Sequence, residues 1–220
     1  MGSYWGFISH NNRINFINNP IFFFIFDKNQ LKMNIMRYAL TIFFIAIINI
    51  ALSQKLEVTP KGLKDAENID KSYIVLNIEE TPADKLYNNA FKYISKNYRN
   101  PEKVIKAKIE NEYLKFGTHE SEFLIINNSG AKIPIKANYT IELSFKDNKV
   151  KFEINELSMP AKRGGYNVLF SGGAFSGYPI YNKKGDLKRT DTKKEIEVYF
   201  NSQILSLKEY LKGETDDNNW

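Results

Sequence analysis

The sequence predicts an α+β fold, in which one antiparallel sheet carries two helices packed on one of its faces. In the middle of the chain, 139–146 and 149–157 alternate apolar and polar residues around a short polar turn, which is typical of a sheet with one buried face. Apolar residues recur at helical spacing in 82–98 and in 191–212. The order β-α-β(n)-α is most simply packed with both helices on the apolar face of the sheet.

The first strand and helix are expected at 73–78 and 82–98. The strand segment YIVLNI is apolar and β-branched. For the helix, Thr81 is the expected N-cap and Pro82 the first helical residue, and Pro101 lies just beyond its end. The expected buried face consists of apolar residues at helical spacing, namely Leu86, Tyr87, Ala90, Phe91, Ile94 and Tyr98.

Three short strands are then expected at 104–109, 112–117 and 121–126, followed by the hairpin. In the hairpin, Asp147 and Asn148 form the turn. The residues expected to face the core are Tyr139, Ile141, Leu143, Phe145, Val150, Phe152, Ile154 and Leu157.

The regular pattern is lost between 160 and 191, where six glycines are interleaved with aromatic residues. Long loops without regular structure tend to be functional or disordered. Three interpretations remain open: an ordered lid, an extra strand, or a mobile loop. If the segment is an exposed binding surface, its residues are the aromatic side chains Tyr166, Phe170, Phe175, Tyr178 and Tyr181.

The last helix is expected from Asp191 or Thr192, either of which is a suitable N-cap, to Lys212, with Gly213 ending it. Residues 214–220 are acidic and are expected to form a disordered tail. The predicted apolar face of this helix consists of Ile196, Phe200, Ile204, Leu207 and Leu211.

This order and text resemble a bacterial family, the domain of unknown function 4468, which is described as having a TBP-like fold. The resemblance covers 72–158 and rests on the first strand, the helix end AFKYISKNY, the segment VIKAKIENEYLKFGTH and the hairpin YTIELSFKDNKVKFEINEL. The chain has Thr118-His119 where the family has a Gly-x-Gly ending. Members look like secreted proteins of Gram-negative bacteria, so the resemblance implies export. It implies no activity and no site residues.

An export signal is expected at 33–53. It has one positive charge, at Arg37, then an apolar run of about 15 residues, shorter than the roughly 20 that a spanning helix needs. Small residues favour cleavage after Ser53, which leaves no transmembrane anchor. We expect 1–32 to be a spurious extension from an early start codon. We expect 54–71 to be a polar linker and 72–213 to be a single domain, periplasmic or secreted.

Catalytic and metal-binding chemistry is not indicated. The chain has no cysteine, which excludes disulfides, thiol catalysis and a lipidated Cys. From residue 54 onward there are 27 basic and 24 acidic residues, interspersed along the chain, and His119 is the one histidine. No basic stripe indicates nucleic-acid binding. The nearby carboxylate pairs lie among polar neighbours, where nothing suggests a raised pKa; they are Glu110/Glu112, Glu120/Glu122 and Glu153/Glu156.

We therefore expect a non-enzymatic envelope protein without a cofactor. It would bind an envelope protein or a glycan through the glycine-rich and aromatic segment 164–181. The alternative is a carrier of a small apolar ligand, in which the last helix closes a curved sheet over a cavity, as in helix-grip lipid carriers. Nothing in the sequence indicates an oligomeric state.

Overall fold

The structure, a computed structural model, describes residues 54–173 and 175–213. The expected extension at 1–32, the signal peptide at 33–53 and the tail at 214–220 lie outside these residues, so they stay predictions. Within the described ranges, no helix is long and apolar enough to cross a membrane.

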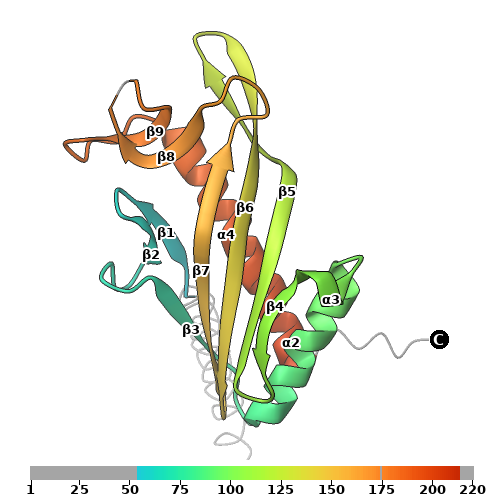
Figure 1. Cartoon of the computed structure of the whole chain (residues 1–220). Helices are drawn as coiled ribbons and strands as arrows, with labels where there is room; N and C mark the ends of the chain where they lie inside the picture. The colour runs from blue at the N-terminus through green and yellow to red at the C-terminus, as the bar shows by residue number, and fades with distance from the viewer. Residues whose placement is uncertain (1–53, 174, 214–220) are drawn as a thin grey trace, which may run out of the picture. The chain divides into compact units, whose positions relative to one another are not determined.

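A seven-stranded sheet forms the body of the domain (Figure 1). Its strands lie in the order β4-β5-β6-β7-β8-β9, and β3 also pairs with β7. All pairs are antiparallel except β8 with β9, which run parallel. The strands are β3 (Tyr73–Asn77), β4 (Ile105–Ile109), β5 (Tyr113–Asn128), β6 (Ala131–Lys146), β7 (Lys149–Pro160), β8 (Asn167–Gly172) and β9 (Tyr178–Asn182).

Strand β5 is one continuous strand of 16 residues, so the prediction of two short strands at 112–117 and 121–126 is wrong. Its register against β6 shifts between Glu120 and Leu124. A bulge of this kind absorbs extra residues without ending the strand. The polar residues that interrupt the alternation in the sequence therefore mark the bulge and not a break.

The hairpin β6–β7 buries one face, as predicted, which confirms the α+β class with a one-sided sheet. Leu143 and Phe152 are opposite each other in the register and both are buried. On the other face, Lys115 Nζ lies 3.0 Å from a carboxylate oxygen of Glu142. Ion pairs and hydrogen bonds lie on this polar face of the sheet, while the helices cover the apolar face.

Helices α2 (Ala83–Asn97) and α4 (Thr190–Lys212) both lie on the apolar face, also as predicted, and α4 runs along it (Figure 1). A one-turn helix, α3 (Pro101–Val104), precedes β4. The two long helices contact each other, and the Asn89 side-chain amide donates a hydrogen bond of 3.1 Å to the Leu211 carbonyl. The predicted apolar face of α4 is buried, and Gly213 ends the helix with φ of 79°.

The turn of the β6–β7 hairpin caps helix α2. The backbone N–H of Thr81 donates to Asn148 Oδ1, and that of Ala83 donates to Asp147 Oδ1, both at 2.9 Å. Pro82 occupies the N-cap position, and the Thr81 hydroxyl donates instead to the Glu79 carbonyl. The expectation that Thr81 caps the helix is therefore wrong, because a turn distant in sequence supplies the acceptors.

The buried face of α2 differs from the prediction at several positions. Phe91 and Tyr98 are only partly buried, whereas Asn89 and Tyr93 are buried. For Tyr93 the reason is the contact with α4: its hydroxyl donates to Gln203 Oε1 at 2.9 Å, and its ring meets the edge of Tyr210 with centroids 5.2 Å apart. One side of α2 therefore packs against α4 and another packs against the sheet.

Residues 54–71 are not a polar linker, contrary to the sequence prediction. They contain the hairpin of β1 (Leu56–Thr59) and β2 (Gly62–Asp65), which buries Leu56, Val58 and Leu63. The Asn201 side chain on α4 accepts a hydrogen bond from the Leu56 N–H at 2.9 Å and donates one to the Leu56 carbonyl at 3.0 Å. The strands have only four residues each, so their alternation is too short to be recognised in a polar segment.

The N-cap of helix α4 lies two or three residues earlier than expected. Arg189 is its N-cap residue, without a side-chain capping bond, so Asp191 and Thr192 lie inside the first turn. Its start is fixed by β9 instead, since the backbone N–H groups of Lys188 and Arg189 both donate to the Ile180 carbonyl, at 2.8 and 3.2 Å.

Candidate functional site

The glycine-rich segment forms the strands β8 and β9, which is the extra-strand arrangement among those left open by the sequence. Met159 of β7 pairs with Val168 of β8, and Val168 in turn pairs with Tyr178 of β9. Val168 and Ile180 are buried, which attaches these strands to the core. Gly177 permits the return between them, because φ there is 134° and a Cβ atom would lie 2.4 Å from the Asn167 carbonyl oxygen.

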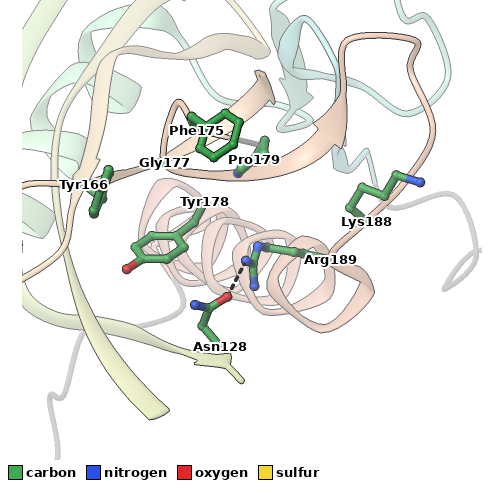
Figure 2. Close-up of a pocket in the computed structure, with 8 residues that line it drawn as sticks. All are labelled: Asn128, Tyr166, Phe175, Gly177, Tyr178, Pro179, Lys188 and Arg189. Carbon is green, nitrogen blue, oxygen red and sulfur yellow. Dashed lines mark hydrogen bonds between the residues drawn. The ribbon is translucent and has the colours of Figure 1, made fainter. Parts of the chain in front are cut away.

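Beside β8 and β9 lies a hollow of about 500 Å³, which we call the β9 hollow (Figure 2). Three parts of the fold contribute to it: the end of β5, the β8–β9 region and the connection from β9 to α4. The residues that line it are Asn128, Tyr166, Phe175, Gly177, Tyr178, Pro179, Lys188 and Arg189.

The structure brings three of the five sequence-predicted surface residues to this hollow. Phe175 is 99% exposed and Tyr166 is 52% exposed, while Tyr178 is partly buried beside them. Phe170 and Tyr181 are elsewhere. Phe170 packs partly buried against the core, and Tyr181 is 9% exposed, with its hydroxyl donating to the Val58 carbonyl at 2.8 Å. These two rings support the fold beneath the hollow.

Arg189 is held in place by two contacts (Figure 2). Its guanidinium carbon lies 5.4 Å from the centroid of the Tyr178 ring, and its Nη2 group donates to Asn128 Oδ1 at 3.1 Å. The Tyr178 ring meets the edge of Tyr166, with centroids 6.0 Å apart. Stacking and hydrogen bonding together restrict the rotamers of the arginine, so the charge has a fixed position at the hollow.

The β9 hollow is basic. Lys188 and Arg189 line it and no acidic residue does. Within 54–173 and 175–213, neither cation forms an ion pair with a carboxylate. Two positive charges at a concave surface attract an anion more strongly than the same charges on a flat one, because the surrounding protein limits screening.

A second hollow of about 380 Å³ adjoins the first and shares Lys188 and Arg189 with it. Asp191 and Glu195 of the first turns of α4 line this second hollow. Burial raises the pKa of the Glu195 carboxyl above its usual value, and the nearby Asp191 carboxylate raises it further. The surface thus changes from basic to acidic across Arg189.

The sequence analysis missed Asn128, Lys188 and Arg189. The positive charge had a signal that a regional count would have found. Residues 161–190 contain six basic residues and one acidic residue, whereas 54–160 and 191–213 together contain 21 basic and 20 acidic residues. A count of charged residues over the whole chain from residue 54 hides this excess, because the rest of the chain has nearly equal numbers of basic and acidic residues. Asn128 has no comparable signal, because it lies far from Arg189 in sequence.

The groups considered for catalysis do not gather in the structure. His119 is exposed, and its Nδ1 atom lies 2.6 Å from Asn138 Oδ1. Glu153 accepts a hydrogen bond from the Ser72 hydroxyl at 2.6 Å and pairs with Lys151. Across the described ranges, no group of three or more histidine and carboxylate side chains is arranged to hold a metal ion.

Aromatic rings lie between α4 and the sheet, where a helix-grip carrier would hold its ligand. The Phe200 ring contacts Tyr139 and Phe123, with centroid separations of 5.1 and 5.8 Å. Tyr199 contacts Phe123 at 4.8 Å. Side chains therefore occupy this part of the interior.

The fold places the chain in the α+β class of proteins. Its mainly antiparallel sheet has one apolar face, and the helices cover that face. Residues 73–159 match the family model "Domain of unknown function (DUF4468) with TBP-like fold". The match confirms the resemblance read from the sequence for this part of the chain, with bounds shifted by one residue. Strands β1, β2, β8 and β9, helix α4 and nearly all of the β9 hollow lie outside the matched residues.

Two solved structures are similar to the chain. One is a DUF4468 family protein from Bacteroides ovatus, with 14% identity and a TM-score of 0.45, covering 66% of this chain and 87% of the other. The second is a TBP-like protein from Parabacteroides distasonis, with 13% identity and a TM-score of 0.44, covering 64% of this chain and 90% of the other. No curated protein matches the chain.

Proposed function

We propose that this protein is an exported, non-enzymatic binding module of the bacterial cell envelope, and that the β9 hollow holds its ligand. The observation that carries the proposal is the exposed Phe175 ring, placed beside Tyr166 and Tyr178 at a concave surface. An aromatic ring in water forgoes the free energy that its burial would release. The Phe175 ring recovers that free energy when a ligand covers it.

The β9 hollow suits ligand recognition because its strands are attached to the core, while the rings of Tyr166 and Phe175 are accessible to solvent. Buried Val168 and Ile180 attach the strands to the core, and Arg189 is held by Tyr178. Preorganised side chains lose little conformational entropy on binding. Exposed rings provide contact area, and the amide and guanidinium groups provide directional hydrogen bonds.

Binding is tested with the chain 54–220 and a panel of four immobilised polymers: dextran, polygalacturonate, phosphomannan and poly-L-glutamate. We expect measurable binding to at least one of them. The double variant Tyr166→Ala/Phe175→Ala should lower the affinity about tenfold or more, since rings at the centre of a contact often contribute at least this much.

The matched control is Val198→Ala/Leu205→Ala, which truncates two exposed apolar side chains on α4. This control should bind as the parent does, and circular dichroism should show that both double variants are folded. Equal affinities of the parent and the Tyr166/Phe175 variant, or no binding to any polymer, would contradict the proposed site.

Export is tested separately. Expression of the full chain in a Gram-negative host should yield a periplasmic or secreted protein that begins at Gln54, because small residues precede the proposed cleavage point. N-terminal sequencing that finds Met33 or an earlier residue retained in the exported fraction would refute the signal peptide.

A further inference from the structure

We propose that the β9 hollow binds an acidic saccharide, with a sugar ring against Tyr166 and Phe175 and its carboxylate or phosphate group at Lys188 and Arg189. This inference rests on the proposed function, because it names the ligand class of the same hollow. Charge, hydrogen-bonding capacity and the geometry of the neighbouring strand edge support it in turn.

The charge of the folded part of the chain is concentrated at this end. Of the residues 161–190, six are basic and one is acidic. The single carboxylate, that of Asp186, accepts a hydrogen bond of 2.8 Å from the Asn182 amide. Asp186 does not line the hollow. Asp191 and Glu195 line the adjoining hollow on the other side of Arg189, so the charged side chains that line the β9 hollow itself are the two cations, and these favour an anion there.

Arg189 has hydrogen-bond donors to offer. A guanidinium carries five N–H donors, and among the described residues Arg189 donates one side-chain hydrogen bond, to Asn128 Oδ1. The Tyr178 ring contacts the guanidinium as a cation–π partner, and no N–H group of Arg189 donates to the tyrosine hydroxyl. A planar group with free N–H donors matches the paired oxygens of a carboxylate or phosphate. Lys188 also lines the hollow, and its side chain extends away from that of Arg189 (Figure 2), so its ammonium, which has no partner in the described ranges, places a second positive charge apart from the guanidinium.

The strand edge beside the hollow disfavours an extended peptide as the ligand. A peptide that adds to a sheet needs an edge with free backbone groups. On β9 two of these groups are already used: the Ile180 carbonyl accepts from Lys188 and Arg189, and the Asn182 N–H donates to the Asp186 carbonyl at 2.9 Å. Side-chain recognition remains available, and it suits a ligand without a peptide backbone.

The rings complete the match to a saccharide. Phe175 has no polar atom, so it offers only an apolar ring surface, and it is almost fully exposed. One face of a pyranose presents C–H groups and packs on such a surface, while its hydroxyl groups stay hydrated. An anionic substituent on the same sugar would then reach the cations that share the hollow with Phe175.

The experiment measures the affinity of the chain 54–220 by calorimetry for the four polymers, at about 50 mM and about 300 mM salt. We expect polygalacturonate or phosphomannan to bind at least about tenfold more tightly than dextran and poly-L-glutamate, a difference of about 1.4 kcal/mol. The affinity should fall at the higher salt concentration. Preference between the two acidic polymers identifies the anion as carboxylate or phosphate.

Charge variants locate the site. Lys188→Gln and Arg189→Gln should each lower the affinity for the preferred acidic polymer about fivefold or more. Lys188 is exposed, and its side chain has no partner among the described residues, so its replacement leaves the fold intact. The matched control is Lys149→Gln, which makes the same charge change on an exposed lysine at the β6–β7 turn and should bind as the parent does.

Each failure has a distinct meaning. Dextran binding that equals acidic-polymer binding and is lost in Tyr166→Ala/Phe175→Ala would overturn the anionic ligand and leave the proposed function standing. Poly-L-glutamate binding of equal strength would overturn the saccharide. Equal affinities of Lys188→Gln, Arg189→Gln and Lys149→Gln would overturn the assignment of the cations. No binding to any polymer would contradict both the inference and the proposed function.

Discussion

The two ends of strand β7 use polar side chains in opposite ways. At its start, Asp147 and Asn148 direct their side-chain oxygens to the backbone of residues 81–83 and so stabilise the first turn of α2. Near its other end, Lys188 has no protein partner in the described ranges and Arg189 donates one side-chain hydrogen bond. The first end satisfies its polar groups within the fold, whereas at the second an aromatic ring is exposed and side-chain donors have no protein partner in the described ranges.

The β8–β9 end itself contains a set of buried side chains and a set of exposed ones. Ile180 and Tyr181 on β9 are buried, while Phe175 in the preceding loop is exposed. A mutation of buried Ile180 or Tyr181 should lower the free energy of unfolding, and a mutation of exposed Phe175 should weaken ligand binding. Four predictions test this division, in order of decreasing effect on the free energy of unfolding.

The largest effect is expected for Ile180→Ala. Ile180 is fully buried beneath the hollow, so its truncation leaves a cavity and should lower the free energy of unfolding by about 2–5 kcal/mol. Urea denaturation provides the measurement. Ile109→Ala, at an isoleucine of β4 that is 56% exposed, is the matched control and should change little. Equal small effects would show that β9 does not belong to the core.

The second prediction concerns the closed end. Asn148 accepts the Thr81 hydrogen bond and has φ of 64°, in the left-handed region. Asn148→Ala loses the acceptor and strains the backbone, so we expect a loss of about 1–3 kcal/mol. Asn148→Gly loses the acceptor but tolerates this φ, and should cost less. A neutral Asn148→Ala variant would remove the contrast between the two ends.

A smaller effect is expected for Tyr181→Phe. The Tyr181 hydroxyl donates to the Val58 carbonyl, which also accepts from Lys193 Nζ at 3.1 Å. The carbonyl therefore keeps a partner, and the loss should be about 0.5–1.5 kcal/mol. Tyr166→Phe, at a half-exposed ring, serves as the control for removal of a hydroxyl and should leave the urea midpoint unchanged.

The smallest effect on stability is expected for Phe175→Ala. The free energy of unfolding should change by no more than about 0.5 kcal/mol, since the ring is exposed. The same variant should weaken ligand binding, whereas Ile180→Ala should mainly lower the free energy of unfolding. A loss of stability above about 1 kcal/mol would mean that the ring packs against the protein in solution.

The elements read correctly from sequence are those whose pattern is local. Alternation around Asp147 and Asn148 identified the central hairpin, and the spacing from Ile196 to Leu211 identified the buried face of α4. Each signal repeats several times within one element. The one-sided sheet and the two covering helices followed from these repeats alone.

The errors arose where a distant partner decides the structure. Hairpin β1–β2 is held by α4, and the start of α2 is capped by a turn that lies more than 60 residues away. In the candidate site, Tyr166 and Phe175 were named from the sequence for the case that the glycine-rich segment is an exposed surface, and the structure leaves both rings exposed. Asn128 could not be anticipated, since only the folded sheet brings it to Arg189.

The bond between the first strand and the last helix has a consequence for how the chain folds. Asn201 serves both backbone groups of Leu56 across a separation of 145 residues. Contacts between residues so far apart in sequence form slowly, because the loop between them must close first. During synthesis, these backbone groups of Leu56 have no partner on α4 until Asn201 has been added. The contacts that attach hairpin β1–β2 to α4 therefore depend on both ends of the domain being present.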